Sequence, residues 1–146
     1  MEGDFQINEN IENKFAIYTN KEDVMAKKRI AILACKNIKG ISCVAGCLKC
    51  FKGIAEKAGE YERWKDYDVE VIAMDDCGGC PGVLMPKVAL MMDMGKLYER
   101  DFDAIHLGTC IMKAVQTAKC PIDIEDIKKK IEGKFNKEVI FGTHPY

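Results

Sequence analysis

The eight cysteines of this 146-residue chain are its most evident source of chemistry. Thiolates bind soft metal ions and iron-sulfur clusters, and a pair of thiols can exchange two electrons with a disulfide. One or two of the eight are expected to be small buried hydrophobic residues, but packing does not explain why cysteines cluster. In a reducing compartment, such a chain is more typical of a metal-binding or catalytic protein than of a disulfide-stabilised one.

A compact triad is formed by Cys43, Cys47 and Cys50, which are spaced C-x3-C-x2-C. On a helix this spacing places the three sulfurs on one side, and in a loop it wraps three thiolates around one corner of a cubane. The triad favours a [4Fe-4S] cluster over zinc, because structural zinc sites more often combine two separate C-x2-C pairs. The alternative is that the three cysteines form the buried stripe of a helix.

A second motif, CGGCPG, begins at Cys77 and contains the thiol pair Cys77 and Cys80. Its two glycines permit a sharp turn between a strand and a helix, and the dipole of the following helix is expected to lower a thiol pKa. Such a pair either binds metal or acts as a redox dithiol. In a redox reaction, Cys77 would attack and Cys80 would resolve the mixed disulfide.

Four short apolar runs predict the strands that position these residues, at 29–35, 69–74, 102–107 and 138–141. Amphipathic patterns predict helices at 45–58 and 84–98, and a last helix after Pro121 that ends at Gly133. In the first of these helices, the predicted apolar stripe consists of Leu48, Phe51, Ala55 and Ala58. Strands that alternate with helices indicate a three-layer α/β fold of the Rossmann-like or flavodoxin-like type, with a short parallel sheet of about four strands and flanking helices.

Each predicted strand stops at a potential ligand. Cys35, Cys77 and Cys110 follow the first three strands, and the fourth runs into His144. The carboxyl ends of parallel strands share one edge, so we expect these residues and Cys80 to lie in one neighbourhood. Two further residues are weaker candidates. Cys120 is either a ligand or a cysteine outside the cluster, and His106, inside the third strand, is expected to be a core histidine.

The composition excludes several classes of function. The 22 basic and 23 acidic residues nearly cancel and form no basic patch, so the chain has no electrostatic footprint for nucleic acid. We find neither a secretory signal nor an apolar stretch long enough to span a membrane, and we expect a cytoplasmic protein. Residues 1–28 are interpreted as an N-terminal extension, with an edge strand or a partly ordered segment at 15–19, and residues 29–146 as one domain.

These motifs, taken in order, resemble the CGGC domain family. The resemblance covers the chain from Arg29 to Tyr146, and includes the cysteine-rich segment 43–51, the run IHLGTC that ends at Cys110, and the terminal GTH at 142–144. It implies metal binding, and it brings no established reaction with it. Related chains are frequent in anaerobic bacteria and archaea, a setting that permits oxygen-labile clusters.

The sequence therefore predicts a metal-binding protein that carries a [4Fe-4S] cluster or zinc and functions in redox chemistry or in metal or cluster handling. Its partners would be the metal ion or cluster and a redox protein. The predicted ligands are Cys35, Cys77, Cys80, Cys110 and His144, with members of the triad Cys43, Cys47 and Cys50. These donors exceed the four that one centre needs, which allows two centres, or one centre beside a reactive dithiol. The alternative is an enzyme, a thiol-disulfide or metal-ion reductase that uses Cys77 and Cys80.

Overall fold

A four-stranded parallel sheet forms the centre of the protein. The computed structural model describes residues 25–39, 43, 47–80, 82–117 and 120–146, so the predicted segment at 15–19 lies outside the described residues. The strands are β1 (Lys27–Ala34), β2 (Asp68–Asp76), β3 (Ala104–Leu107) and β4 (Glu138–Phe141), and their order is β2-β1-β3-β4. Every neighbouring pair is parallel, which confirms the predicted fold class.

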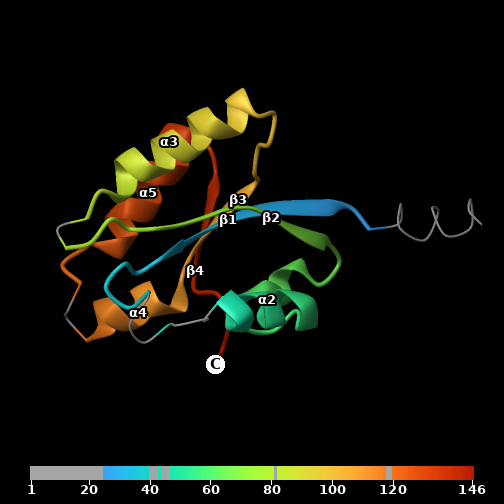
Figure 1. The fold of residues 1–146 in the computed structure, drawn as a ribbon, viewed down its shortest axis with the longest axis horizontal. Helices are drawn as coiled ribbons and strands as arrows, with labels where there is room; N and C mark the ends of the chain where they lie inside the picture. The colour runs from blue at the N-terminus through green and yellow to red at the C-terminus, as the bar shows by residue number, and fades with distance from the viewer. Residues whose placement is uncertain (1–24, 40–42, 44–46, 81, 118–119) are drawn as a thin grey trace, which may run out of the picture.

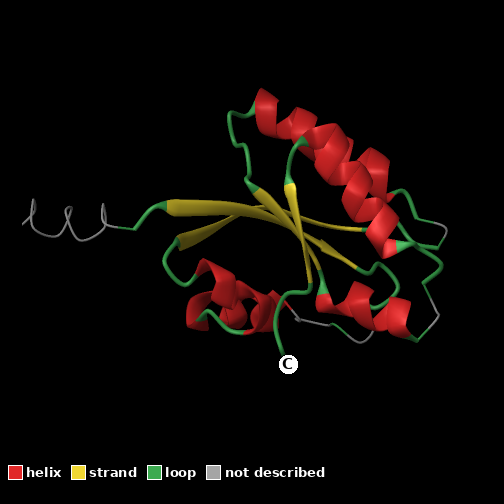
Figure 2. Cartoon of the chain, turned by 180° about the vertical axis from the view of Figure 1, so that it is seen from behind, coloured by secondary structure: helices red, strands yellow, loops and turns green. Residues whose placement is uncertain are grey.

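Helices cover both faces of this sheet (Figures 1 and 2). On one side lie α2 (Cys47–Glu56) and the 3-10 helix η1 (Gly59–Trp64), and on the other lie α3 (Leu84–Leu97), α4 (Thr109–Gln116) and α5 (Ile124–Phe135). The arrangement gives three layers. Within the described ranges, none of these helices has both the length and the apolar character needed to cross a membrane.

The side chains of β1 alternate between the two layers of helices. Ala31 and Leu33 are buried in the core beneath α3, α4 and α5, whereas Ile30 and Ile32 are buried on the side of η1. Both faces of the strand are covered, so its sequence is apolar throughout. The alternation continues past the end of the strand and places Cys35 in the same core as Leu33.

Two predicted features of the helices are wrong. α5 does not end at Gly133 but continues to Phe135, and Asn136 terminates it in the left-handed conformation with φ of 53°. In α2, Leu48 and Phe51 are 69% and 47% exposed, so the predicted apolar stripe does not face the core. Gly53 lies inward instead, because a Cβ atom there would be only 3.1 Å from the ring of Tyr61.

The helix α4 was not predicted, because Cys110 was interpreted as the end of a strand. The strand β3 ends at Leu107, and Cys110 lies in the first turn of α4. Ile111 and Ala114 of this helix are buried in the core. An eight-residue helix offers only two turns of amphipathic pattern, too few to distinguish it from a loop in the sequence.

His106 is a core residue, as predicted, and is fully buried. Its Nε2 atom accepts a hydrogen bond from the indole of Trp64 at 2.9 Å, and its Nδ1 atom lies 2.9 Å from the carbonyl oxygen of Gly142. The first contact makes Nε2 an acceptor, so the neutral ring donates from Nδ1. His106 therefore joins β3 to η1 and to the segment that follows β4.

This burial predicts a loss of stability in mild acid. Burial lowers the pKa of His106 from 6.5 to about 4. Between these values the unfolded chain binds a proton that the folded chain excludes, so the free energy of unfolding falls as the pH drops below 6.5, by at most about 3 kcal/mol.

Urea unfolding at a series of pH values, compared between the wild type and His106→Gln, measures this contribution. The variant is expected to be less stable at pH 7 and to lose less further stability between pH 6.5 and 5. Equal losses in the two proteins would contradict the assignment.

Candidate metal centre

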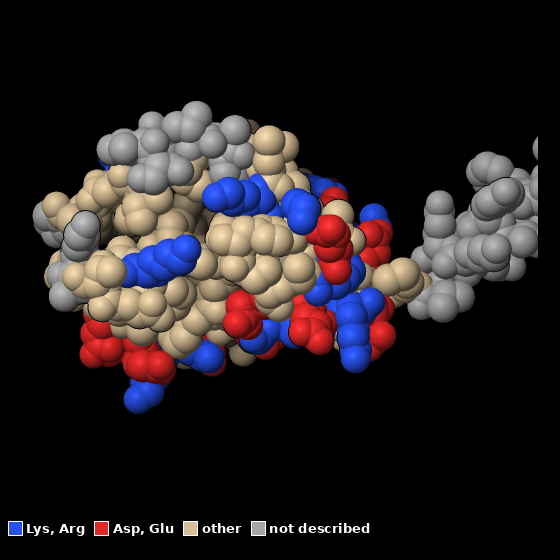
Figure 3. All heavy atoms as spheres, turned by 90° about the horizontal axis from the view of Figure 1, so that it is seen from below, with Lys and Arg blue, Asp and Glu red and all other residues tan. Residues whose placement is uncertain are grey.

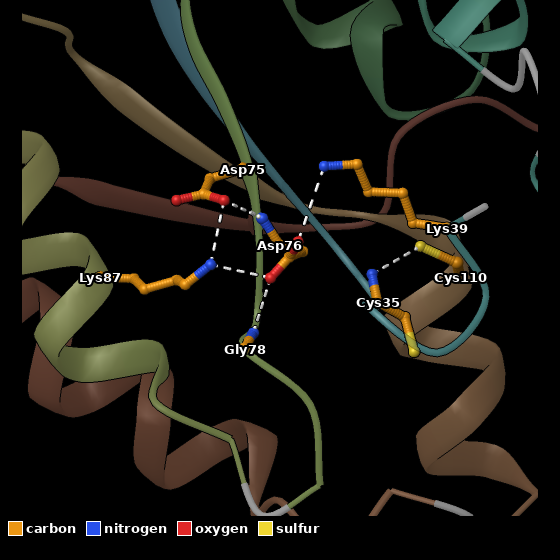
Figure 4. Close-up of polar contacts among 7 residues, drawn as sticks. All are labelled: Cys35, Lys39, Asp75, Asp76, Gly78, Lys87 and Cys110. Carbon is orange, nitrogen blue, oxygen red and sulfur yellow. Dashed lines mark hydrogen bonds and ion pairs between the residues drawn. The ribbon is translucent and has the colours of Figure 1, made fainter.

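Hydrogen bonds beyond the strand ends bring the cysteine-bearing segments to one edge of the sheet. The amide of Cys77 donates to the carbonyl oxygen of Ala34 at 2.9 Å, and the amide of Gly108 donates to that of Leu33 at 2.7 Å. The amide of Cys35 in turn donates to Cys110 Sγ at 3.1 Å (Figure 4). The segments that follow β1, β2 and β3 are therefore held side by side.

A large hollow opens at this edge on the α2 side of the sheet. Its volume is about 670 Å³, and its lining includes His144 and four of the cysteines, namely Cys43, Cys47, Cys50 and Cys110. The charged residues that line it are Lys39, Lys49, Lys113 and one acid, Asp75. Figure 3 shows this side of the molecule, where Lys and Arg side chains lie beside the depression. The hollow therefore combines several soft ligands with a positive rim.

A smaller hollow of about 350 Å³ lies on the opposite side of the same edge. Its lining contains the other four cysteines, namely Cys35, Cys77, Cys80 and Cys120. The side chain of Asn37 donates to Cys80 Sγ at 3.5 Å. Cys35 and Cys77 are 6% and 4% exposed, Cys80 is exposed, and Cys120 is half-buried.

The structure thus brings the predicted ligands to two adjacent hollows and not to one. Cys35, Cys77 and Cys80 line the smaller hollow, whereas Cys110 and His144 line the larger one with the triad. Cys120, for which the sequence allows either a ligand or a cysteine outside the cluster, also lines the smaller hollow. All eight cysteines are free thiols. Among the described residues, no three Cys, His, Asp or Glu side chains converge closely enough to hold a single metal ion.

Two thiols of the larger hollow, those of Cys50 and Cys110, favour their neutral form in the absence of a cation. Burial is the main cause that raises the pKa of Cys50; the neighbouring Thr143 partly opposes it, and the Cys43 and Cys110 thiols raise it further. Burial also raises the pKa of Cys110. A metal must therefore displace protons from these thiols when it binds.

Two buried polar atoms beside the larger hollow lack a hydrogen-bond partner among the described residues, namely the hydroxyl of Tyr61 and Nδ1 of His144. The Tyr61 side chain adjoins Cys50 and Thr143. Burial lowers the pKa of His144, which favours the neutral ring. An unpaired buried polar group typically costs about 1–3 kcal/mol. A bound thiolate would accept a hydrogen bond from the Tyr61 hydroxyl, and a metal would accept the lone pair of His144.

The CGGC loop turns as sharply as the sequence predicts. Gly78 and Gly79 have φ of +86° and +105°, which residues with a side chain rarely adopt. Asp76 fixes the start of the loop, because its Oδ1 atom accepts hydrogen bonds from the amide of Gly78 at 2.9 Å and from Lys87 at 2.8 Å (Figure 4).

The expected lowering of a thiol pKa does not occur at Cys80. Its pKa is raised, first by its removal from water and then by the nearby thiols of Cys120, Cys77 and Cys35. The helix that was expected to lower this pKa begins only at Leu84. Of the two thiols of the motif, Cys80 is exposed and Cys77 is buried, whereas the predicted attacking thiol is Cys77.

Comparison with known proteins identifies the family of this chain. Residues 29–144 match the CGGC domain. The chain belongs to the CGGC domain family. A relative in Methanocaldococcus jannaschii, the uncharacterized protein MJ0582, is 35% identical over 119 residues, which cover 80% of this chain and 86% of the relative. No solved structure matches the chain at a significant level. A CGGC domain with eight cysteines fits a cysteine-rich, metal-binding protein.

The glycine geometry of the CGGC loop generates a direct test. In Gly78→Ala, the new methyl group would occupy a strained backbone conformation and collide with Val83, so a loss of about 1–3 kcal/mol in the free energy of unfolding is expected. The matched control is Gly133→Ala, where nothing lies within 4 Å of the new methyl group. Because Gly133 is inside α5, this control is expected to gain up to about 1 kcal/mol.

Urea denaturation measures both changes. Equal stability of Gly78→Ala and the wild type would show that the loop does not adopt the described turn.

Proposed function

We propose that this CGGC domain is a metal-binding protein whose larger hollow holds a [4Fe-4S] cluster through Cys43, Cys47, Cys50 and Cys110. The observation that carries the proposal is the position of Cys110. It is distant in sequence from the triad, yet it lines the same hollow and supplies the fourth thiol. Three cysteines in a short segment and one from elsewhere form a common ligand set for such a cluster.

The size of the hollow favours a cluster over a single zinc ion. A zinc ion with Zn–S bonds of about 2.3 Å draws its four sulfurs to about 3.8 Å from one another. A cubane holds its four thiolates around a larger body, and a hollow of about 670 Å³ provides room for it.

The charges around the hollow suit an anionic centre. Four thiolates outweigh the positive charge of the iron-sulfur core, and Lys39, Lys49 and Lys113 line the hollow where they can compensate the excess. One of the three, Lys39, also reaches Asp76, with a nitrogen-oxygen distance of 3.6 Å. When bound, a cluster of this kind accepts and releases single electrons.

Two residues outside the thiolate set complete the proposed site. The Tyr61 hydroxyl is buried beside Cys50 and Thr143, and it would donate to the Cys50 sulfur once that thiol ionises. His144 is a further nitrogen donor that lines the same hollow. The proposal includes a reducing, cytoplasmic setting, in which all eight thiols stay free.

Serine substitution of one triad cysteine and of Cys110 tests the proposal. Cys50→Ser and Cys110→Ser are each expected to lower the iron and acid-labile sulfide of anaerobically purified protein at least several-fold. Both variants should also melt at a lower temperature, because ligand binding contributes to folding stability. Elemental analysis and visible absorbance measure the content.

Cys80→Ser is the matched control for these variants, because Cys80 lines the other hollow. It is expected to keep full iron content. Full iron content in both Cys50→Ser and Cys110→Ser would contradict the proposal. A colourless, metal-free protein that reversibly loses two thiols would support the dithiol reductase alternative at Cys77 and Cys80.

The role of Tyr61 generates a second prediction. A hydrogen bond to a ligand sulfur stabilises the more negative, reduced state, so Tyr61→Phe is expected to keep the cluster and to lower its reduction potential. The phenylalanine ring preserves the packing against His106, whose ring centroid lies 4.9 Å from that of Tyr61. Potentiometric titration of the visible absorbance measures the shift, and an unchanged potential would show that the hydroxyl makes no such bond.

A further inference from the structure

We propose that the smaller hollow is a second, separate thiolate site, in which Cys35, Cys77, Cys80 and Cys120 bind one thiophilic divalent ion of the zinc type. The four residues come from three different segments, which follow β1, follow β2 and precede α5. They nevertheless line one hollow of about 350 Å³. The inference does not depend on which group occupies the larger hollow.

Two of the four thiols are fixed by the sheet. Cys35 and Cys77 each come directly after one of the adjacent parallel strands β1 and β2, and the amide of Cys77 donates to the carbonyl oxygen of Ala34. Both side chains are buried, at 6% and 4% exposure. This pair therefore supplies two lining thiols whose backbone positions are set by the sheet.

Of the other two thiols, neither Cys80 nor Cys120 lies in a helix or a strand. Cys80 is exposed at the end of the CGGC turn, and Cys120 is half-buried shortly before α5. An ion would gather the four sulfurs as it binds, because metal sites are rarely complete before the metal arrives.

The electrostatics of the hollow favour a cation. Four cysteines line this one hollow, and their thiolates would repel one another without a cation between them. The group that donates to Cys80 is the neutral amide of Asn37, and among the described residues that line the hollow the one charged side chain is that of Lys113. A divalent ion would offset the negative charge of the thiolates far more effectively than Asn37 and Lys113 do.

The arrangement fits a metal site better than a dithiol. A disulfide between Cys77 and Cys80 would leave Cys35 and Cys120 unexplained at the same hollow. A C-x2-C pair completed by two further cysteines is a donor set typical of structural zinc.

The experiment measures zinc and iron in anaerobically purified full-length protein and in three variants. The wild type is expected to bind one zinc ion per chain in addition to the iron of the larger hollow. Cys80→Ser and Cys120→Ser should each weaken zinc binding at least tenfold, measured by competition with a chromophoric chelator, and retain iron. Cys47→Ser, in the larger hollow, should lose iron and keep zinc. This opposite response distinguishes failure of the second site from failure of the proposed cluster.

A measurement without substitutions guards against variants that fail to fold. Alkylation of the wild-type thiols, mapped by mass spectrometry, should find Cys80 and Cys120 protected together in the zinc-bound protein and reactive together after chelation. Retention of zinc by both Cys80→Ser and Cys120→Ser would overturn the proposal. So would alkylation of Cys80 at the same rate with and without zinc, or a stable Cys77–Cys80 disulfide in protein that binds no zinc.

Discussion

The parallel register of the sheet is the constraint on which every other feature of the candidate sites depends. The hydrogen-bond ladder does not stop where the strands stop. It continues from Cys77 to Ala34, from Gly108 to Leu33 and from Gly142 to Leu107. Segments that are far apart in sequence are thereby fixed at one edge with little freedom to separate. The eight cysteines gather there because the chain places them immediately after strands or in the helices and loops that begin at that edge.

The pleat of the strands then distributes the gathered cysteines between the two faces of the sheet. Side chains of β1 alternate between the two faces, so Cys35 continues the row of Ala31 and Leu33, whereas Ile32 and Ala34 line the hollow on the opposite side. The division is narrow, because the amide of Cys35 donates to the sulfur of Cys110, which lines the other hollow. Two groups of four thiols can thus be distinct in their ligands and still adjacent. Through the hydrogen bond from the amide of Cys35 to the sulfur of Cys110, a change of charge in one hollow would alter the electrostatic potential in the other.

Much of the fold could be predicted from the sequence, because the apolar runs of the four strands are short, bounded and buried on both faces. The role of His106 and the turn at Gly78 and Gly79 were also predictable, since each depends on local residue type. The distribution of the cysteines between the two hollows could not be predicted. It depends on which face each side chain takes after its strand ends, and an error of one residue at a strand boundary reverses that face. The same uncertainty concealed α4 and thereby the position of Cys110. The inward face of α2 was missed because close packing against Tyr61 requires a glycine, and a search for apolar stripes does not detect one.

The central claim is that the carboxyl edge of the sheet gathers the cysteines around two hollows that bind metal. Anomalous X-ray diffraction from crystals of anaerobically purified protein, recorded at the iron and zinc absorption edges, tests it most directly. The account predicts an iron signal in the hollow bounded by Cys50, Cys110 and His144, and a separate zinc signal between Cys77 and Cys120. Well-ordered cysteines without an anomalous signal at either position, or a metal bound away from this edge, would contradict it.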